Sequence, residues 1–479
     1  MVLKDQLSHI IESLSQVGFE MVLIGGSLLL LLLGLIAKRS LVSQIVYVLV
    51  LVLAMTLVPL PTDLGVWFGG ALAVQELTWL FRLVFSFLGV WVVFYPTANR
   101  HPFEYYFLLL AVIAGSAFML SAQHLLVIYL AIELTSFASY LLTNFNFEKR
   151  SFEAGIKYLI FGGTASALAL YGASLIYGFT GTLLVSEMDF ALVQNPALLN
   201  VGLLLFIGAM LFKVSLVPFH IWVPTTYQVA PTSAVAILSV IPKIAGFVLL
   251  HRVLLAVDVH TQYWLYVVIV AVGMATIVIG TLGALRQTNI KRMIAYGAIA
   301  HSGFLLGALL IPGETGVVAF AWYALAYGII NLVAFYMVSV LEDRQLLDVK
   351  DLAGLSRTEG YFGGLITIVM VALIGLPPTV GFTIKFYLFT ALWGWYQTVV
   401  DPWIMGYLVV ALMSVVFSLF FYLKVPYFIF LKESDGDVQS VTNPGQRVIA
   451  TIFTLVLLWL FISPDILNNI ADNIKSIAW

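Results

Sequence analysis

Four charged side chains interrupt stretches of the sequence that are otherwise apolar. Lys213 lies in "LLLFIGAMLFKVSLVPF", Lys243 in "SVIPKIAGF" and Lys385 in "GLPPTVGFTIKFYLF". Glu133 lies at the centre of "VIYLAIELTSFASYLL". A charge at the centre of a membrane helix costs about 2.5–3.5 kcal/mol on insertion scales. These side chains must therefore face protein or water, and each must be either paired or neutral.

Such groups are suited to proton transfer. Burial favours the neutral amine of a lysine, whereas a nearby carboxylate favours the charged ammonium. Lys213 can therefore change its protonation according to its distance from Glu133, as a proton relay requires. The alternative is a static ion pair that only fixes helix packing. Lys243 and Lys385 have no carboxylate nearby in the sequence, which favours the relay for these two residues.

Two further cations lie near the ends of apolar stretches. Lys157, in "AGIKYLIFGG", is close to the cytoplasmic interface. It is either an auxiliary relay group or a side chain that extends to the interface. Arg82 lies near the outer end of its stretch, and we expect it to reach the interface in the same way.

Prolines accompany three of the lysines. Each of the following lies within eight residues of Lys213, Lys243 or Lys385: Pro218, Pro242, Pro377 and Pro378. A proline inside a helix removes a backbone hydrogen bond and clashes with the carbonyl four residues earlier. Inside a membrane the freed groups must be satisfied by protein or water. We therefore expect broken helices beside a polar interior, as in ion-coupled transporters, rather than simple packing kinks.

Other polar side chains can connect these charges. Tyr323, Tyr327 and Asn331 are spaced by four residues, so they share one helix face. His301, in "IAYGAIAHSGF", titrates near neutral pH and suits proton transfer, although a lone buried histidine is as often structural. Because no two histidines have the spacing of metal ligands, we predict no metal site.

The composition defines the setting of these residues. The chain has 479 residues, of which 62% are hydrophobic and 10% charged, whereas soluble domains carry about 25% charged residues. The apolar runs are continuous rather than alternating, which favours helices over a β-barrel. We therefore predict an all-α polytopic membrane protein whose first apolar run is a retained span. A net charge of −2 indicates no nucleic-acid partner, and the absence of cysteine excludes cysteine-held iron–sulfur clusters from this chain.

About 14 transmembrane helices are expected from the apolar runs. Their centres lie near residues 28, 50, 85, 112, 133, 167, 209, 238, 274, 300, 328, 370, 412 and 455. With both termini outside, fourteen lysines and arginines of the connections, Lys291 among them, face the cytoplasm. Only Lys4, Arg252 and Lys475 then lie outside, so the positive-inside rule favours this orientation.

Spans seven and twelve each carry a lysine and a helix break, and they run in opposite directions. This placement predicts two inverted five-helix repeats, helices 4–8 and helices 9–13. The expected division is an N-terminal three-helix segment (1–100), the first repeat (101–255), the second repeat (256–432) and a C-terminal helix 14 (433–479).

Three motifs carry a family resemblance that spans nearly the whole chain. "FKVSLVPFHIWVPTTYQVAP", "KRMIAYGAIAHSGF" and "GLPPTVGFTIKFY" resemble the antiporter-like membrane subunits of respiratory complex I. Tyr227, in "TTYQVAP", is similar to the subunit N (subunit 2) family, whereas subunits L and M and the Mrp antiporter chains usually have a histidine-bearing element there. Lys385 also favours subunit N over subunit M, which typically has a glutamate at this position.

The resemblance implies a role for each charge. Glu133 and Lys213 correspond to the paired charges of spans five and seven, Lys243 to the central lysine and Lys385 to the lysine that opens the output side. Lys157 resembles an additional lysine of span six. The chain departs from the usual "PDVYQGAP" of this family at Thr225 and Val229, and also at Pro242, which leaves the charged series intact.

The resemblance further implies a proton-translocating subunit of an NADH:quinone oxidoreductase that does no redox chemistry itself. FMN, iron–sulfur clusters and quinone are then expected in partner subunits, in a hetero-oligomer with M-like and K-like neighbours. The location implied is a bacterial-type inner (plasma) membrane. The alternatives are an Mrp-type cation/proton antiporter subunit, the equivalent subunit of a ferredoxin-fed photosynthetic complex or membrane hydrogenase, and a purely scaffolding chain.

Overall fold

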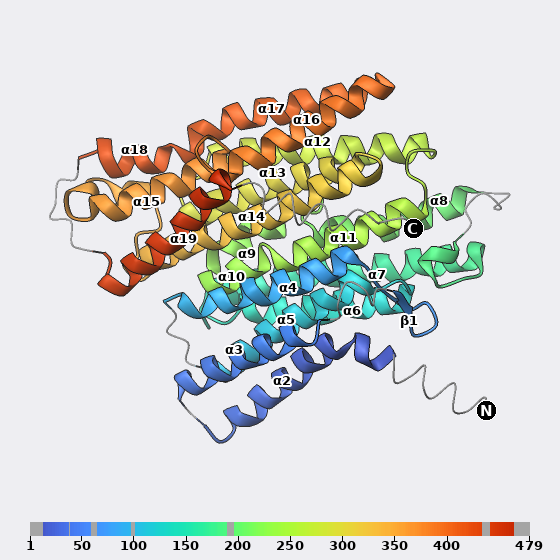
Figure 1. Ribbon diagram of the computed structural model, residues 1–479, viewed down its shortest axis with the longest axis horizontal. Coiled ribbons are helices and arrows are strands. Elements are labelled where there is room, and N and C mark those ends of the chain that lie inside the picture. Colours follow the sequence, from blue (N-terminus) through green and yellow to red (C-terminus); the bar gives the residue numbers. More distant parts are fainter. Residues whose placement is uncertain are drawn as a thin grey trace.

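The long apolar runs fold into long helices. The computed structural model describes residues 13–37, 39–58, 65–96, 101–188, 196–433 and 441–463. In these ranges the chain is almost entirely helical, apart from a small antiparallel hairpin of β1 (Gly65–Trp67) and β2 (Leu72–Val74). Both terminal ends lie outside the described residues. Figure 1 shows α2 and α3 at one edge of the bundle and α17 and α18 at the opposite edge.

The helices follow one another with short connections. In chain order they are α2 (Gly18–Gly34), α3 (Ser40–Thr56), α4 (Glu76–Trp91), α5 (Pro102–Ser121), α6 (Leu125–Thr143), α7 (Lys149–Thr180), α8 (Pro196–Lys213), α9 (Trp222–Val229), α10 (Thr232–Leu238), α11 (Ile241–Ala256), α12 (Tyr263–Leu285), α13 (Ile290–Leu310), α14 (Gly313–Glu342), α15 (Ser356–Ile374), α16 (Val380–Val399), α17 (Pro402–Tyr422), α18 (Lys424–Leu431) and α19 (Pro444–Ile462). Short 3₁₀ turns occur at η2 (Val92–Phe94), η3 (Val185–Glu187) and η4 (Val349–Leu352).

The expected number of spans agrees with this architecture. Among the described residues, eleven helical segments are long and apolar enough to cross a membrane, with α10 and α11 forming one of them. Three shorter apolar helices, α2, α3 and α8, bring the number to fourteen. The helices α11, α13 and α14 are buried almost throughout and form the core. By contrast, α3, α7 and α17 leave many large apolar side chains exposed, as expected for helices that face lipid.

Three spans are broken at the expected places. The helix of Lys213 ends at that residue, and α9 begins nine residues later at Trp222. In the next span, α11 begins at Ile241 with Pro242 in its first turn, where a missing N–H costs no helical hydrogen bond. Helix α15 ends at Ile374 and α16 begins at Val380. Backbone groups are thereby freed in the interior beside each of the three lysines.

Arg82 does not reach the interface as expected. Its guanidinium and the Glu20 carboxylate are both completely buried, and they form an ion pair of 2.7 Å between α4 and α2. A long cation near the end of a span can extend to water, but a carboxylate on a neighbouring helix provides an internal partner. This pair could not be predicted from the sequence, because 62 residues separate its members.

Arg252 is also buried, although the loop count placed it in an outer connection. It donates hydrogen bonds to the carbonyl oxygens of Ala122, at 2.6 Å, and Leu120, at 2.8 Å, where α5 ends. Carbonyls at a helix C-terminus have no helical partner and carry partial negative charge, so a cation stabilises them.

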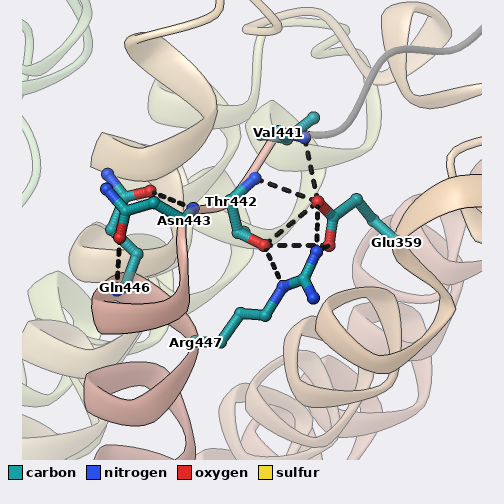
Figure 2. A network of polar contacts seen from close by, with 6 residues as sticks. All are labelled: Glu359, Val441, Thr442, Asn443, Gln446 and Arg447. Carbon is teal, nitrogen blue, oxygen red and sulfur yellow. Dashed lines mark hydrogen bonds and ion pairs between the residues drawn. The ribbon is translucent and has the colours of Figure 1, made fainter.

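A network of polar contacts attaches α19 to α15 (Figure 2). The buried Glu359 carboxylate accepts hydrogen bonds from the backbone N–H groups of Val441 and Thr442, both at 3.0 Å. It also accepts from the Thr442 hydroxyl at 2.9 Å and from the Arg447 guanidinium at 3.0 Å. We refer to Glu359, Thr442 and Arg447 as the α15–α19 clamp. It holds the segment that leads into α19 against the rest of the bundle.

Candidate functional site

Glu133 and Lys213 lie close together but have separate hydrogen-bond partners. Lys213, the last residue of α8, donates to the Ser136 hydroxyl of α6 at 3.0 Å. Glu133 of α6 accepts a hydrogen bond from Ser166 of α7. The two charges interact electrostatically, but no direct ion pair between them occurs in the described part of the chain. A small cavity between α6, α7 and α8, which Lys213 lines, has room for about one water molecule.

A glycine connects this pair to the central lysine. A Cβ atom at Gly246 would lie 3.5 Å from Cγ of Lys213, so the Lys213 side chain passes directly over this position. Gly246 lies three residues after Lys243 and therefore on the same side of α11. The two lysines thus follow one another across the α8–α11 contact.

Lys243 lies at the start of α11, and its ammonium reaches α13. It donates to the Ala298 carbonyl at 3.2 Å and to the Ser302 hydroxyl at 3.3 Å. The Tyr227 ring of α9 lies 5.9 Å from the lysine nitrogen, within the range of a cation–π contact. The partners of this lysine are therefore a carbonyl, a hydroxyl and an aromatic face.

His301 lies between the central lysine and the last one. Its Nδ1 is 2.7 Å from the Tyr323 hydroxyl, and its ring centroid is 5.0 Å from that of Tyr327. The imidazole interacts electrostatically with both Lys243 and Lys385. The histidine predicted from its place in the sequence is thus in a position to connect the two lysines.

Asn331, which was predicted to share a helix face with Tyr323 and Tyr327, also lies in the core. Asn331 is buried and donates to the Tyr327 carbonyl at 3.1 Å. The Tyr327 hydroxyl donates to the Ser239 carbonyl at 3.4 Å, at the break between α10 and α11. This face of α14 therefore meets the backbone next to Lys243.

Lys385 lies in the second turn of α16, and its side chain reaches back across the break to α15. Its ammonium donates to the carbonyl oxygens of Leu373, at 3.2 Å, and Ile374, at 2.6 Å, which end α15. The Phe304 ring lies 5.2 Å from the nitrogen. Gly375 has φ +88°, and a Cβ atom there would lie 2.6 Å from Cδ of Lys385. Only glycine allows both this backbone and this close approach.

Lys157 lies apart from the buried series. It forms an ion pair with Glu153, one turn earlier on α7, at 2.6 Å, and these side chains are 54% and 64% exposed. Both line a cavity of about 760 Å³ at the start of α7. We call it the polar cavity, and its lining also includes Asn146, Glu148, Arg150, Thr225, Gln228, Asn289 and Glu342.

A buried ion pair adjoins this cavity, and sequence reasoning missed it. Lys291 was assigned to a cytoplasmic connection, yet its side chain is 0% exposed. It donates to Glu342 at 2.9 Å and to the Ala230 carbonyl at 2.7 Å. The second oxygen of Glu342 accepts from the Thr232 hydroxyl. The loop count was misleading here because Lys291 is the second residue of α13 and its side chain turns inward.

Other residues of the site also went unnoticed in the sequence. Ser136, Ser166 and Ser302 each hold one of the charges. Ser136 lies one helical turn after Glu133, which is a usable signal. No comparable helical spacing relates Ser166 to Glu133 or Ser302 to Lys243 in the sequence. Gly375, just before the paired prolines, could have been suspected as a helix C-terminal glycine.

The arrangement of these side chains suits proton movement. Among the described residues, no group of three histidine or acidic side chains is placed to hold a metal ion. Glu133, three buried lysines and a histidine instead follow one another through the core, with hydroxyls and carbonyls at each position. Buried polar groups of this kind inside membrane helices are typical of proton pathways.

Comparisons with known proteins identify the family of this chain. Residues 122–420 match the family model described as NADH:quinone oxidoreductase/Mrp antiporter, TM. NADH-quinone oxidoreductase subunit N 2 of Rhizobium meliloti is 32% identical over 440 residues, covering 89% of this chain and 90% of that protein. NADH-quinone oxidoreductase subunit N of Heliobacterium modesticaldum is 36% identical over 363 residues, covering 75% of each.

Solved structures show the same architecture. A chain of respiratory complex I from Thermus thermophilus has a TM-score of 0.78 and 28% identity, covering 94% of this chain and 98% of its own length. A chain of the Mrp complex from Dietzia has a TM-score of 0.84 at 21% identity, covering 97% of both chains. The second likeness shows the fold alone. Taken with the relatives above, the chain belongs to the NADH:quinone oxidoreductase/Mrp antiporter transmembrane family, as an antiporter-like membrane subunit of the complex I subunit N type.

Proposed function

We propose that this chain translocates protons within an NADH:quinone oxidoreductase. The observation that carries the proposal is the order of Glu133, Lys213, Lys243, His301 and Lys385 through one buried core. Protons would enter near Lys243, and the Glu133–Lys213 pair would control its charge. Lys385 would release them on the output side, and Lys157, Tyr323, Tyr327 and Asn331 would have auxiliary roles.

The coupling to redox chemistry would be electrostatic or conformational. Two unit charges about 4 Å apart interact by about 4 kcal/mol at an effective dielectric of 20. A movement of Lys213 between Ser136 and Glu133 would therefore change the potential felt along the series. FMN, iron–sulfur clusters and quinone are assigned to partner subunits, and the absence of cysteine in this chain is consistent with a non-redox role.

Partner chains are expected on at least one face of this bundle. Glu133 and Ser166 are only half-buried, on α6 and α7, and an exposed carboxylate in the middle of a bilayer is costly. A neighbouring M-like or K-like membrane subunit would cover it. We place the complex in a bacterial-type inner membrane, with both termini outside and inverted repeats at 101–255 and 256–432.

The direct test replaces Lys213 in the assembled complex. We expect Lys213→Met to lower the number of protons pumped per NADH oxidised in proteoliposomes, and Glu133→Gln to do the same. Lys432→Met is the matched control, because Lys432 is exposed and lies at the end of α18. Unchanged pumping in both site variants would contradict the assignment.

Co-purification in mild detergent separates this function from the Mrp alternative. Recovery with flavin- and iron–sulfur-containing chains that oxidise NADH supports the proposal. Recovery with small hydrophobic chains alone would favour a cation/proton antiporter. Flavin-free partners that accept electrons from ferredoxin or react with hydrogen would indicate a related photosynthetic or hydrogenase complex.

A further inference from the structure

The polar cavity ends close to Lys243 without reaching it. Its wall is formed partly by Thr225 and Gln228 of α9. Tyr227, between them in the sequence, is completely buried and has its ring 5.9 Å from the Lys243 nitrogen. A single turn of helix therefore separates the cavity from the central lysine.

Buried hydroxyls on this turn have no protein partner. Within the described residues, neither the Tyr227 hydroxyl nor the Thr226 hydroxyl has a hydrogen-bond partner. Buried polar groups are nearly always satisfied, by protein or by ordered water. The inner side of α9 is therefore a place where water is needed, next to Lys243.

The Lys291–Glu342 pair lies at the boundary between the two compartments. Glu342 lines the polar cavity and is 32% exposed, whereas Lys291 behind it is 0% exposed. Lys291 also holds the Ala230 carbonyl, and Glu342 holds Thr232. Ala230 and Thr232 flank the junction between α9 and α10. The pair thus ties α13 and α14 to the junction that separates the cavity from Lys243.

A second carboxylate offers Lys291 an alternative position. Glu148, at the start of α7, lines the same cavity and interacts electrostatically with Lys291. A buried cation that loses one carboxylate without gaining another is strongly disfavoured. With Glu148 nearby, Lys291 can leave Glu342 without becoming an unpaired buried charge.

We propose that Lys291 and Glu342 form a gate between the polar cavity and the interior that contains Lys243. The closed gate is the ion pair in this structure. When it opens, Lys291 turns toward Glu148, the α9–α10 junction is released, and water from the cavity reaches the hydroxyls next to Lys243. This inference rests on the proposed proton translocation, since a gate at this position matters only if protons reach Lys243.

Hydrogen–deuterium exchange in the assembled complex tests the gate with water itself as the probe. We expect the segment 230–243 to exchange faster during NADH oxidation than at rest in the unaltered complex. In Glu342→Gln it should exchange about tenfold faster already at rest, which corresponds to about 1.4 kcal/mol. NADH should then add no further increase. A purely structural pair would show no dependence on turnover.

Glu153→Gln is the matched control. This change also removes one negative charge from the lining of the polar cavity, but Glu153 belongs to the exposed pair with Lys157. Deuterium exchange in 230–243 should therefore be the same as in the unaltered complex. If the complex does not assemble with Glu342→Gln, Glu342→Asp can be used instead, because it keeps the negative charge on a shorter side chain. We expect Glu342→Asp to raise deuterium exchange in 230–243 at rest, but by less than tenfold.

The proposal is overturned if exchange in 230–243 is the same at rest and during turnover, or is unchanged by substitution of Glu342. This outcome is distinct from failure of the proposed function, which is measured as pumping by Lys213→Met. If Lys213→Met lowers proton pumping but substitution of Glu342 leaves exchange in 230–243 unchanged, the proposed function stands and the gate is rejected.

Discussion

At the scale of single residues, the three buried lysines of the proposed proton path are held by neutral groups, unlike Lys291, which pairs with Glu342. Lys213 has a serine, Lys243 has a carbonyl and a serine, and Lys385 has two carbonyls. A neutral acceptor stabilises the ammonium less than a carboxylate contact would, so each charge is easier to remove. Easier loss of the proton from each lysine is what a proton relay requires and what a set of static ion pairs would prevent.

The serine that holds Lys213 provides the first prediction. Ser136→Ala removes the hydrogen bond of 3.0 Å to the lysine nitrogen, and a hydrogen bond to a charged group contributes about 1.5–3 kcal/mol. We expect fewer protons per NADH, measured in proteoliposomes. Ser139→Ala is the control, since Ser139 lies one turn later and donates to the Thr135 carbonyl instead. Equal effects of the two changes would argue against a specific role of Ser136.

Gly375 provides a second prediction at this scale. Gly375→Ala places a methyl group 2.6 Å from Cδ of Lys385 at a positive φ, and an L-residue in that region costs about 1–2 kcal/mol. We expect the Lys385 ammonium to lose its place at the end of α15, with lower pumping and a lower thermal dissociation temperature of the complex. Gly364→Ala, also in α15, is the control because nothing lies within 4 Å of its Cβ position. Unchanged pumping with Gly375→Ala would show that the lysine tolerates displacement.

At the scale of helices, the breaks and the clamp have opposite effects. The breaks at α8–α9, α10–α11 and α15–α16 free backbone groups inside the bundle, which weakens helix continuity where the lysines lie. The α15–α19 clamp strengthens the attachment of α19 near the start of α15. Helix α15 is therefore held firmly at one end and interrupted at the other, so motion is expected near Lys385 rather than near Glu359.

The clamp leads to a prediction about α19. Glu359→Gln weakens the three hydrogen bonds that this carboxylate accepts from Val441 and Thr442, and its ion pair with Arg447. A hydrogen bond to a charged group contributes about 1.5–3 kcal/mol. We expect faster deuterium exchange or proteolysis at the segment 441–450 in the assembled complex. Arg357→Gln is the control, because its pair with Glu433 spans 3.8 Å and is exposed. Equal exchange rates in the two variants would mean that the clamp does not hold α19.

At the scale of the whole molecule, the charged residues form one series rather than two separate sites. Lys213 lies against Gly246, on the same helix as Lys243, and His301 interacts electrostatically with both Lys243 and Lys385. If Lys213 controls the charge of Lys243 and protons then pass to Lys385, these groups act as one unit, and disabling one of them is as effective as disabling two.

A double-substitution experiment tests this order. We expect Lys213→Met and Lys385→Met each to lower pumping strongly, and the double variant to be no worse than the more severe single one. Residues that act as a unit give such non-additive effects. Combining Lys213→Met with Lys432→Met at the exposed end of α18 is the control and should match Lys213→Met alone. Additive losses in the first pair would indicate two parallel routes.

The sequence by itself determined the class of protein, the number of spans and the positions of the breaks. A bilayer requires runs of about 20 apolar residues, and it makes each charge or proline inside them conspicuous. Lys213, Lys243, Lys385 and their prolines were therefore visible without a structure, and the three breaks occur where they were expected.

Only the tertiary structure decided which partner each charge has. Ser136 is 77 residues from Lys213, Glu20 is 62 from Arg82 and Glu342 is 51 from Lys291. Helical periodicity relates residues three or four apart, so it carries no information on contacts between distant helices. The loop count assigned Lys291 to the cytoplasm for the same reason. Its inward orientation depends on α14 bringing Glu342 beside it, which is a property of the packed bundle.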